Sequence, residues 1–531
     1  MNLNQAISEW RAVLGHEQVL ESEAAQRAYG VDASGLERRL AAALRIGDNT
    51  LLPEIVRIAG RHGVPVYPIS TGRNWGYGTA LPVRDDCALI DLRGMNRIVD
   101  FDPELGVVTL EPGVTQQMLA DFLEAGGHPF LVPVTGAGPQ CSLVGNALER
   151  GYGVTPHADH FGAVSDLEAV LADGSLYRTA LRECGGEELA RLFKWGLGPY
   201  SAGLFTQSGF GIVTRMSIAL ARRPECVKVC LFSLKRDELL EPAVERIRTV
   251  LARLPGIVGA INLMNQHRVL AMSAPYPADR LDAEGMIPAA VIAELGRQYQ
   301  IFPWTGFGTL YGTRKVVGAA QKEIRRVLGD VASRMLFLSP SDAKTLAGLA
   351  GVLPGQAGRR LANTVQTLAL SLELVAGRPN ETALPLCYWR NPNPPRGAWR
   401  DPAQDGCGLL WYAPLVPMRP ATVRAYVEMV KRVAVSHRIE PLITFTSISD
   451  KLFDSTVPLI FERSSDQAVQ TAAACYHDLL ESGRAIDCFP YRVGINTMGK
   501  LAALGGESKR FHARLRDALD PERLLAPGRY E

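Results

Sequence analysis

A glycine-rich loop near the start of the chain has the residues to bind a phosphate. The loop spans Pro68–Gly78, follows an apolar run at 63–67, and contains three glycines within seven residues. Closely spaced glycines permit positive φ angles, so successive N–H groups turn toward one point and hold a phosphate or pyrophosphate. Ser70, Thr71 and Arg73 would add donors. The alternative is a tight turn whose glycines only relieve strain.

A second glycine-rich stretch, at 136–162, would line the other side of a long cofactor. The alternative is a set of turns in a β-rich domain. Within this stretch, His157 and His160 are three residues apart, but no third ligand stands near them, so we predict no metal site. The Rossmann fingerprint GxGxxG is missing from the sequence, and a dinucleotide would therefore need another scaffold.

The composition excludes several classes of protein. The 531 residues are 47% hydrophobic and 21% charged, which predicts a soluble chain of two or three domains. A net charge of +2 gives no electrostatic reason to expect nucleic acid or a membrane as partner. The nine cysteines are scattered without a CxxC motif, which favours reduced thiols over a zinc site or a disulfide framework. No stretch is typical of a signal peptide or a transmembrane helix, so we expect a cytoplasmic protein.

The elements around the first loop alternate between helix and strand. The run Asp48-Asn49-Thr50 is placed to cap a helix that ends at Gly63, and the apolar run behind the loop predicts a buried strand. Thr115 is placed to cap another helix. Strands are predicted at 88–92, 97–101, 107–111 and, as a hairpin turning at Asp-Gly, 167–177. This order indicates an α+β domain.

The pattern changes after Glu225. A β run at 227–234 and a helix at 241–251 predict the start of an inserted region. Between 385 and 420 the chain is rich in proline, glycine and aromatic residues, including Trp411, and such rings would wall an aromatic substrate pocket. Ordinary packing in a core or loop is the alternative for each ring taken singly.

Motifs in a fixed order across nearly the whole chain resemble those of a known family. They are Pro68–Gly78, Glu111–Thr115, Gly145–Gly151, Ala172–Gly174, Phe205–Ser208, Gly211–Thr214 and Leu525–Arg529. The sequence is similar to the vanillyl-alcohol oxidase and p-cresol methylhydroxylase flavoproteins, and Gly72–Gly78 and Phe193–Pro199 resemble the branch that oxidises para-alkylphenols. The resemblance implies an α+β fold with a non-Rossmann FAD-binding domain at 1–223 and 487–531, and an inserted α+β substrate or cap domain at 224–486.

FAD is the cofactor that the resemblance implies. The cofactor-binding residues would be Ser70, Thr71, Gly72, Arg73, Asn74, Gly76, Gly145, Asn146, Gly151, Ile212, Val213 and Arg529. Members of the family often tether the flavin to a histidine or tyrosine of the inserted domain. At the comparable histidine position this sequence has Gly408 or Leu409, which predicts non-covalent FAD, with Tyr412 or Tyr388 as alternative tethers.

The resemblance also implies the catalytic residues Tyr77, Tyr491, Arg492 and Asp159. The first three would hold the phenolic oxygen of a substrate, together with Trp411 as a further substrate contact. Two hydroxyl donors and a permanent cation favour the phenolate, which pushes electrons toward the para carbon. Asp159 would lie beside the flavin and act as a base. Taken singly, these residues would more often be a loop tyrosine, an edge-strand tyrosine beside a surface cation, and a turn or capping aspartate, so the assignment rests on the resemblance.

The predicted activity is oxidation of para-substituted phenols, either 4-alkylphenols or 4-hydroxybenzyl alcohols. Hydride would pass from the benzylic carbon to flavin N5 and leave a p-quinone methide. The electron acceptor would be O2 or a cytochrome, and the family implies a homodimer. Two alternatives stay open: a flavoprotein subunit that passes electrons to a cytochrome partner, and an FAD-linked 2-hydroxy-acid dehydrogenase.

Overall fold

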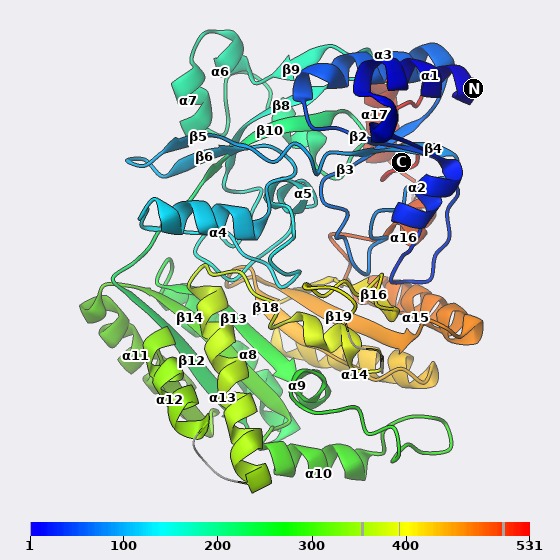
Figure 1. Cartoon of the computed structure of the whole chain (residues 1–531). Coiled ribbons are helices and arrows are strands. Elements are labelled where there is room, and N and C mark those ends of the chain that lie inside the picture. The colour runs from blue at the N-terminus through cyan, green and yellow to red at the C-terminus, as the bar shows by residue number, and fades with distance from the viewer. Residues whose placement is uncertain (1, 352–354, 392, 394, 502–504) are drawn as a thin grey trace.

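Two stacked halves make up the molecule in Figure 1, and both ends of the chain lie in the upper half. The computed structural model describes residues 2–351, 355–391, 393, 395–501 and 505–531. The upper half contains the strands β1 to β11 and the C-terminal helices. The lower half contains β12 to β19 and the helices between them.

The upper half has two main sheets. The first has the order β1-β2-β4-β3, with β2, β3 and β4 parallel; the second is antiparallel, with the order β5-β6-β10-β8-β9. The strands are β1 (Val19–Glu21), β2 (Leu40–Arg45), β3 (Val66–Ile69), β4 (Cys87–Asp91), β5 (Ile98–Asp102), β6 (Val107–Leu110), β8 (Val164–Val170), β9 (Leu176–Arg178) and β10 (Ile212–Ala219). A separate pair joins β7 (Phe130–Leu131) to β11 (Ala221–Arg222).

Helices cover these sheets. They are α1 (Leu3–Leu14), α2 (Ser22–Tyr29), α3 (Leu52–His62), α4 (Gln116–Ala125), α5 (Leu143–Leu148), α6 (Ala180–Glu183), α7 (Glu187–Leu192), α16 (Ile495–Leu501) and α17 (Glu507–Leu519). The predicted caps are confirmed: the Asp48 side chain accepts from Thr50 N just before α3, and Thr115 accepts from Met118 N in α4. Gly63 ends α3 with φ +59°, and β3 then leads into the glycine loop.

The lower half is built on one antiparallel sheet with the order β15-β12-β14-β13-β18-β19-β16, and β17 pairs with β19. Its strands are β12 (Cys226–Leu234), β13 (Val258–Asn265), β14 (Trp304–Gly312), β15 (Arg334–Leu338), β16 (Cys407–Tyr412), β17 (Leu415–Pro417), β18 (Thr444–Ser447) and β19 (Leu452–Glu462). Its helices are α8 (Leu240–Arg253), α9 (Gln266–Ser273), α10 (Ala289–Tyr299), α11 (Arg314–Leu328), α12 (Pro340–Gly351), α13 (Gly355–Val375), α14 (Pro420–Ser436) and α15 (Asp466–Arg484).

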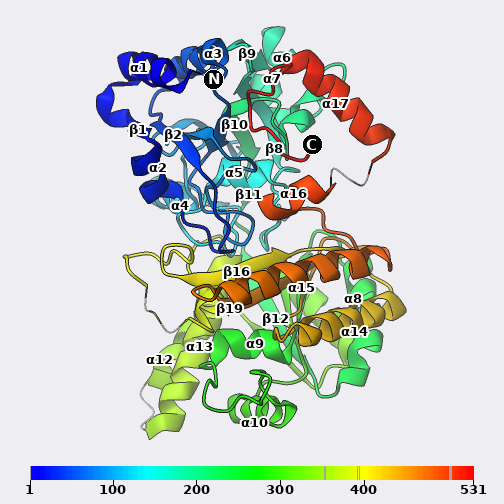
Figure 2. The ribbon, with the colours of Figure 1, turned by 90° about the vertical axis from the view of Figure 1, so that its right-hand side faces the viewer.

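The two faces of this sheet bury different side chains. Helices α8, α11, α14 and α15 cover one face and pack on residues such as Leu263, Phe445 and Phe453; α8, α14 and α15 are labelled in Figure 2. Successive side chains of a strand point to opposite faces. Polar neighbours such as Thr444 and Asp454 therefore point the other way, toward the upper half.

The end of the chain returns to the first sheet. Leu525 forms a parallel bridge with Val66 in β3, and Ala526 N donates to Val66 O at 2.7 Å. Arg516 of α17 is buried, pairs with Asp520 at 3.0 Å and donates to the backbone carbonyls of Gly209 and Leu525. Residues more than 450 positions apart thus form one structural unit.

The sheets change between β11, which ends at Arg222, and β12, which begins at Cys226. The boundaries 223/224 and 486/487 stay predictions. None of the helices within the described ranges has the combination of length and hydropathy that a membrane span requires.

The core of the lower half depends on Trp304. Its ring is fully buried and stacks on Phe445 with centroids 6.1 Å apart, and its Nε1 donates to Asp237 at 2.8 Å. We expect Trp304→Ala to lower the free energy of unfolding by about 3–5 kcal/mol, since it removes a large buried ring. Urea denaturation followed by circular dichroism measures this.

Trp399→Ala is the matched control, because Trp399 is 43% exposed. Its change should stay within about 0.5 kcal/mol. Equal losses for the two variants would contradict this account of the core.

Candidate active site

A cavity of about 510 Å³ lies between the two halves. It brings together most of the residues predicted from the sequence. Those in its wall are Ser70, Thr71, Gly72, Arg73, Asn74, Tyr77, Gly145, Asn146, Gly151, Ile212, Val213, Trp411, Tyr491, Arg492 and Arg529. Side chains from both chain ends and from the lower sheet thus converge on one space.

The upper wall is shaped for a long anionic cofactor. Gly72 has φ +65°, and a Cβ at Gly145 would lie 2.9 Å from Ser70 Oγ, so the loop after β3 and helix α5 approach more closely than side chains would allow. The wall also carries the guanidinium groups of Arg73 and Arg529. Backbone N–H groups and cations are the donors that a pyrophosphate needs, so these residues fit FAD.

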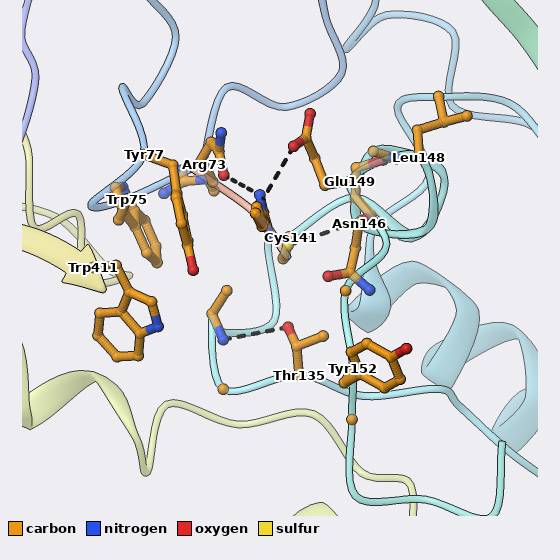
Figure 3. A pocket seen from close by; sticks show the side chains of 18 of the residues that line it. Arg73, Trp75, Tyr77, Thr135, Cys141, Asn146, Leu148, Glu149, Tyr152 and Trp411 are labelled. Atoms are coloured by element: carbon orange, nitrogen blue, oxygen red, sulfur yellow. Dashed lines mark hydrogen bonds and ion pairs between the residues drawn. The ribbon is translucent and has the colours of Figure 1, made fainter. Parts of the chain in front are cut away.

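Tyr77, Tyr491 and Arg492 meet at one end of the cavity. The Arg492 Cζ lies 4.2 Å from the centroid of the Tyr77 ring. In Figure 3, Tyr77 and Trp411 lie on one side of the cavity, and Asn146, Glu149 and Tyr152 lie on the other. Tyr491 is fixed by its own carbonyl, which accepts from Gln207 at 3.1 Å, while its ring contacts Tyr152 edge-on at 5.5 Å.

Burial keeps both tyrosines protonated. It raises the pKa of Tyr77 and of Tyr491 well above the usual value, although the Arg492 charge pulls both down. At neutral pH the two groups are therefore O–H donors beside a cation. That combination stabilises an anionic oxygen placed between them.

Two predicted residues lie outside this arrangement. The structure does not bring Asp159 to the cavity: the side chain is exposed and its Oδ1 accepts from Gly162 N at 2.8 Å, which is the role of a turn aspartate. Gly76 is absent from the cavity wall, and its carbonyl instead accepts from Trp411 N at 3.2 Å. His160 is buried with its pKa lowered to about 4 by burial, and it contacts Asn146. Within the described residues, His, Cys, Asp and Glu side chains form no group of three or more that could bind a metal ion.

Sequence reasoning missed Asp454, a carboxyl group of β19 in the cavity wall. Burial raises its pKa to about 7, against the opposing effects of the Arg492 charge and a hydrogen bond with Tyr491. Its Oδ1 has no hydrogen-bond partner. The only available signal was the alternation of β19, which places Asp454 and Thr456 on the face opposite Phe453 and Val457.

Glu149 was also missed. It lies in the wall between two cations: one oxygen is 3.3 Å from Arg492 Nε, and the other pairs with Arg529. Arg492 further donates to Asn74 Oδ1, and Arg529 donates to Tyr67 at 2.6 Å. The cations of the wall are thus held in place by a carboxylate and by neutral acceptors.

A third missed residue, Arg268, lies in the wall on the side of the lower sheet. Its side chain is 7% exposed, its Nε donates to Thr444 at 2.9 Å, and its Cζ lies 5.9 Å from the Trp411 ring. Burial lowers its pKa to about 10, so it remains charged at neutral pH.

The two tyrosines considered as flavin tethers lie elsewhere. Tyr412 is buried in the core of the lower half and donates to Leu479 O at 2.9 Å. Tyr388 donates to Asp405 at 2.5 Å and is not part of the cavity wall. Leu409, one candidate for the family's histidine position, does line the cavity. Non-covalent binding stays a prediction.

The chain resembles known proteins both in its FAD-binding region and along its full length. Residues 41–180 match the family model described as an FAD binding domain. The chain is 33% identical over 531 residues, 100% of its length and 97% of the relative's, to a 1'-carboxy-chondrochloren decarboxylase of Chondromyces crocatus. It is 27% identical over 533 residues, 99% of its length and 95% of the relative's, to the flavoprotein subunit of 4-cresol dehydrogenase [hydroxylating] of Pseudomonas putida.

A solved structure matches along the whole chain. The crystal structure of p-cresol methylhydroxylase with substrate bound superposes with a TM-score of 0.87 at 25% identity, covering 100% of this chain and 96% of the other. The cavity fits FAD, as described above, and the full-length relatives include flavoproteins. The chain is therefore an FAD-dependent oxidoreductase that belongs to the vanillyl-alcohol oxidase and p-cresol methylhydroxylase family.

Proposed function

We propose that this protein oxidises para-substituted phenols at the benzylic carbon. The observation that carries the proposal is the convergence of Tyr77, Tyr491 and Arg492 at one end of the cavity. The same donors would bind the carboxylate of a 2-hydroxy acid, so the preference for a phenol is supported by the aromatic ring of Trp411 in the cavity wall. Bound FAD would supply the hydride acceptor, at N5 of its flavin ring.

The chain's residues would prepare the phenol for this step. The two tyrosine hydroxyls donate to the phenolic oxygen while Arg492 supplies the positive charge, and together they favour the phenolate. A phenolate releases hydride from its para substituent more readily than a phenol, because its oxygen electrons complete a p-quinone methide. Trp411 would form one wall for the ring.

Asp454 is the group proposed to receive the phenolic proton. With a pKa of about 7 it is partly ionised at neutral pH, and it shares the end of the cavity with Tyr491 and Arg492. Taking the proton neutralises Asp454, so the site carries one negative charge before the transfer and one after it. This role replaces the one that the sequence suggested for Asp159.

The proposal extends to the protein's partners. The electrons would leave to O2 or to a cytochrome, and the likeness to a protein named as a flavoprotein subunit supports a partner protein as acceptor. Non-covalent FAD, a homodimer and a cytoplasmic location remain part of the hypothesis. Slow reaction with O2 together with fast reduction of an added cytochrome would favour the cytochrome.

Anaerobic mixing with substrates tests the proposed function. We expect 4-ethylphenol and 4-hydroxybenzyl alcohol to bleach the flavin absorbance, and their O-methyl ethers to leave it unchanged, because an ether cannot become a phenolate. Bleaching by the ethers, or by no phenol at all, would refute the substrate class.

Tyr491→Phe should slow this reduction by about 10²-fold, the usual effect of losing one donor to a developing oxyanion. The control is Tyr276→Phe, since the Tyr276 hydroxyl is buried, lies outside the cavity wall and has no hydrogen-bond partner. Unchanged rates in both variants would contradict the assignment of Tyr491.

The rate of flavin reduction by 4-ethylphenol should depend on pH through Asp454. Only the ionised carboxylate accepts a proton, so the rate should rise with pH through about 7, the pKa of Asp454. Asp454→Asn should abolish this inflection as well as lower the rate, and stopped-flow measurements between pH 5 and 9 would detect both effects. An inflection near pH 7 that persists in Asp454→Asn would assign it to another group.

A second candidate function is oxidative decarboxylation, favoured by the full-length relative named as a decarboxylase. The first step would be the same. If the substrate carried a carboxylate on the carbon next to the benzylic carbon, the bond to the carboxyl carbon would then break, and its electron pair would form an alkene while the ring returns to phenolate. Carbon dioxide leaves, and the two electrons removed as hydride stay with the flavin.

The substrate 3-(4-hydroxyphenyl)propanoate separates the two candidates. Decarboxylation would give one 4-vinylphenol and one carbon dioxide per flavin reduced, measured by chromatography and by trapping of labelled carbon dioxide. Reduced flavin without carbon dioxide would restrict the activity to benzylic oxidation.

A further inference from the structure

Arg268 is a buried cation for which the described part of the chain supplies no carboxylate. It makes one side-chain hydrogen bond, from Nε to Thr444, and no acidic side chain of the described residues lies within ion-pair distance. Its Nη1 is buried without a hydrogen-bond partner. A buried, unpaired charge lowers the free energy of unfolding by several kcal/mol unless a ligand supplies the opposite charge.

Two other arginines with little exposure are paired with carboxylates. Arg516 is 3% exposed and lies within ion-pair distance of Asp520 and Glu531, and Arg492 pairs with Glu149. Arg268 is as deeply buried, but it faces the cavity with Trp411 beside it. The side of the guanidinium that Thr444 does not occupy is therefore where a ligand would bind.

The position of Arg268 points to the substrate rather than the cofactor. The glycine loop, α5 and Arg529 form the upper wall of the cavity, whereas Arg268 lies on α9, beside the lower sheet. Trp411 lies between Arg268 and the loop that carries Tyr77: its indole is 5.9 Å from Arg268 Cζ, and its backbone N–H donates to the carbonyl of Gly76, the neighbour of Tyr77. Tyr77, Trp411 and Arg268 line the same cavity, so a phenol held at Tyr77 shares that space with the guanidinium.

We propose that Arg268 binds a carboxylate on the para substituent, so that the substrates are 4-hydroxyphenyl acids. This rests on the proposed phenol oxidation, and it holds whether the carboxyl group is kept or lost. A planar guanidinium matches a carboxylate with two parallel hydrogen bonds. A phosphate dianion would require more donors than one arginine among apolar neighbours such as Met264 and Met272.

The test compares two phenols that differ in the terminal group, 3-(4-hydroxyphenyl)propanoate and 4-propylphenol, in the holoenzyme. The wild type should reduce its flavin with a kcat/KM at least about tenfold higher for the acid, from the charged hydrogen bonds. Arg268→Gln should remove this preference mainly through KM for the acid, with little change for 4-propylphenol. Arg268→Lys should restore part of it. Equal use of both phenols by the wild type, or a preference that survives in Arg268→Gln, would overturn the proposal.

A binding measurement separates this proposal from the proposed function. The probe is 3-phenylpropanoate, which has the carboxylate but no phenol to oxidise, and its Kd is measured by titration calorimetry. Arg268→Gln should raise that Kd about 10- to 100-fold, with flavin content and melting temperature recorded for each variant. Failure of every phenol to bleach the flavin would refute the oxidation. Bleaching by both phenols with an unchanged Kd for 3-phenylpropanoate would refute only the role of Arg268.

Discussion

The carboxylate of Glu149 holds two arginines from the end of the chain against a loop from its beginning. Arg492 and Arg529 both pair with it, and Arg492 also binds Asn74 in the glycine loop. Charges this deep are stable only when they are paired or hydrogen-bonded. The pairing therefore fixes the C-terminal segment beside the cofactor wall, and it places the Arg492 guanidinium over the ring of Tyr77.

The lower sheet obeys a different constraint. One face of the sheet lies under the helices and the other faces the cavity. Because successive side chains of a strand point to opposite faces, apolar and polar residues alternate along it. Phe453 and Val457 enter the core, while Asp454 and Thr456 face the cavity. The same strand thus stabilises the lower half and supplies an ionisable group to the site.

Much of this could be predicted from local patterns. Caps such as Asp48 and Thr115, the strand before the glycine loop, and most of the cofactor wall depend on residues close in sequence, and the family motifs located Tyr77, Tyr491 and Arg492. The residues that were missed depend on tertiary contacts. The sequence near Glu149 and Arg268 does not reveal their partners, and for Asp454 it gives only the alternation of β19, because the neighbours of all three come from segments far along the chain. For Asp159 the motif match predicted a role beside the flavin, whereas the structure places its exposed side chain outside the cavity wall, so that role stays a prediction.

The contact between Gly76 and Trp411 joins the two halves at the level of the backbone. Trp411 N donates to the Gly76 carbonyl, and a Cβ on Gly76 would lie 2.9 Å from the Trp411 Cβ. The glycine loop and strand β16 are therefore in direct backbone contact, so a change of backbone position in one of them would disturb the other. A chimera that combined this upper half with the lower half of a relative would have to preserve the contact between Gly76 in the glycine loop and Trp411 in strand β16.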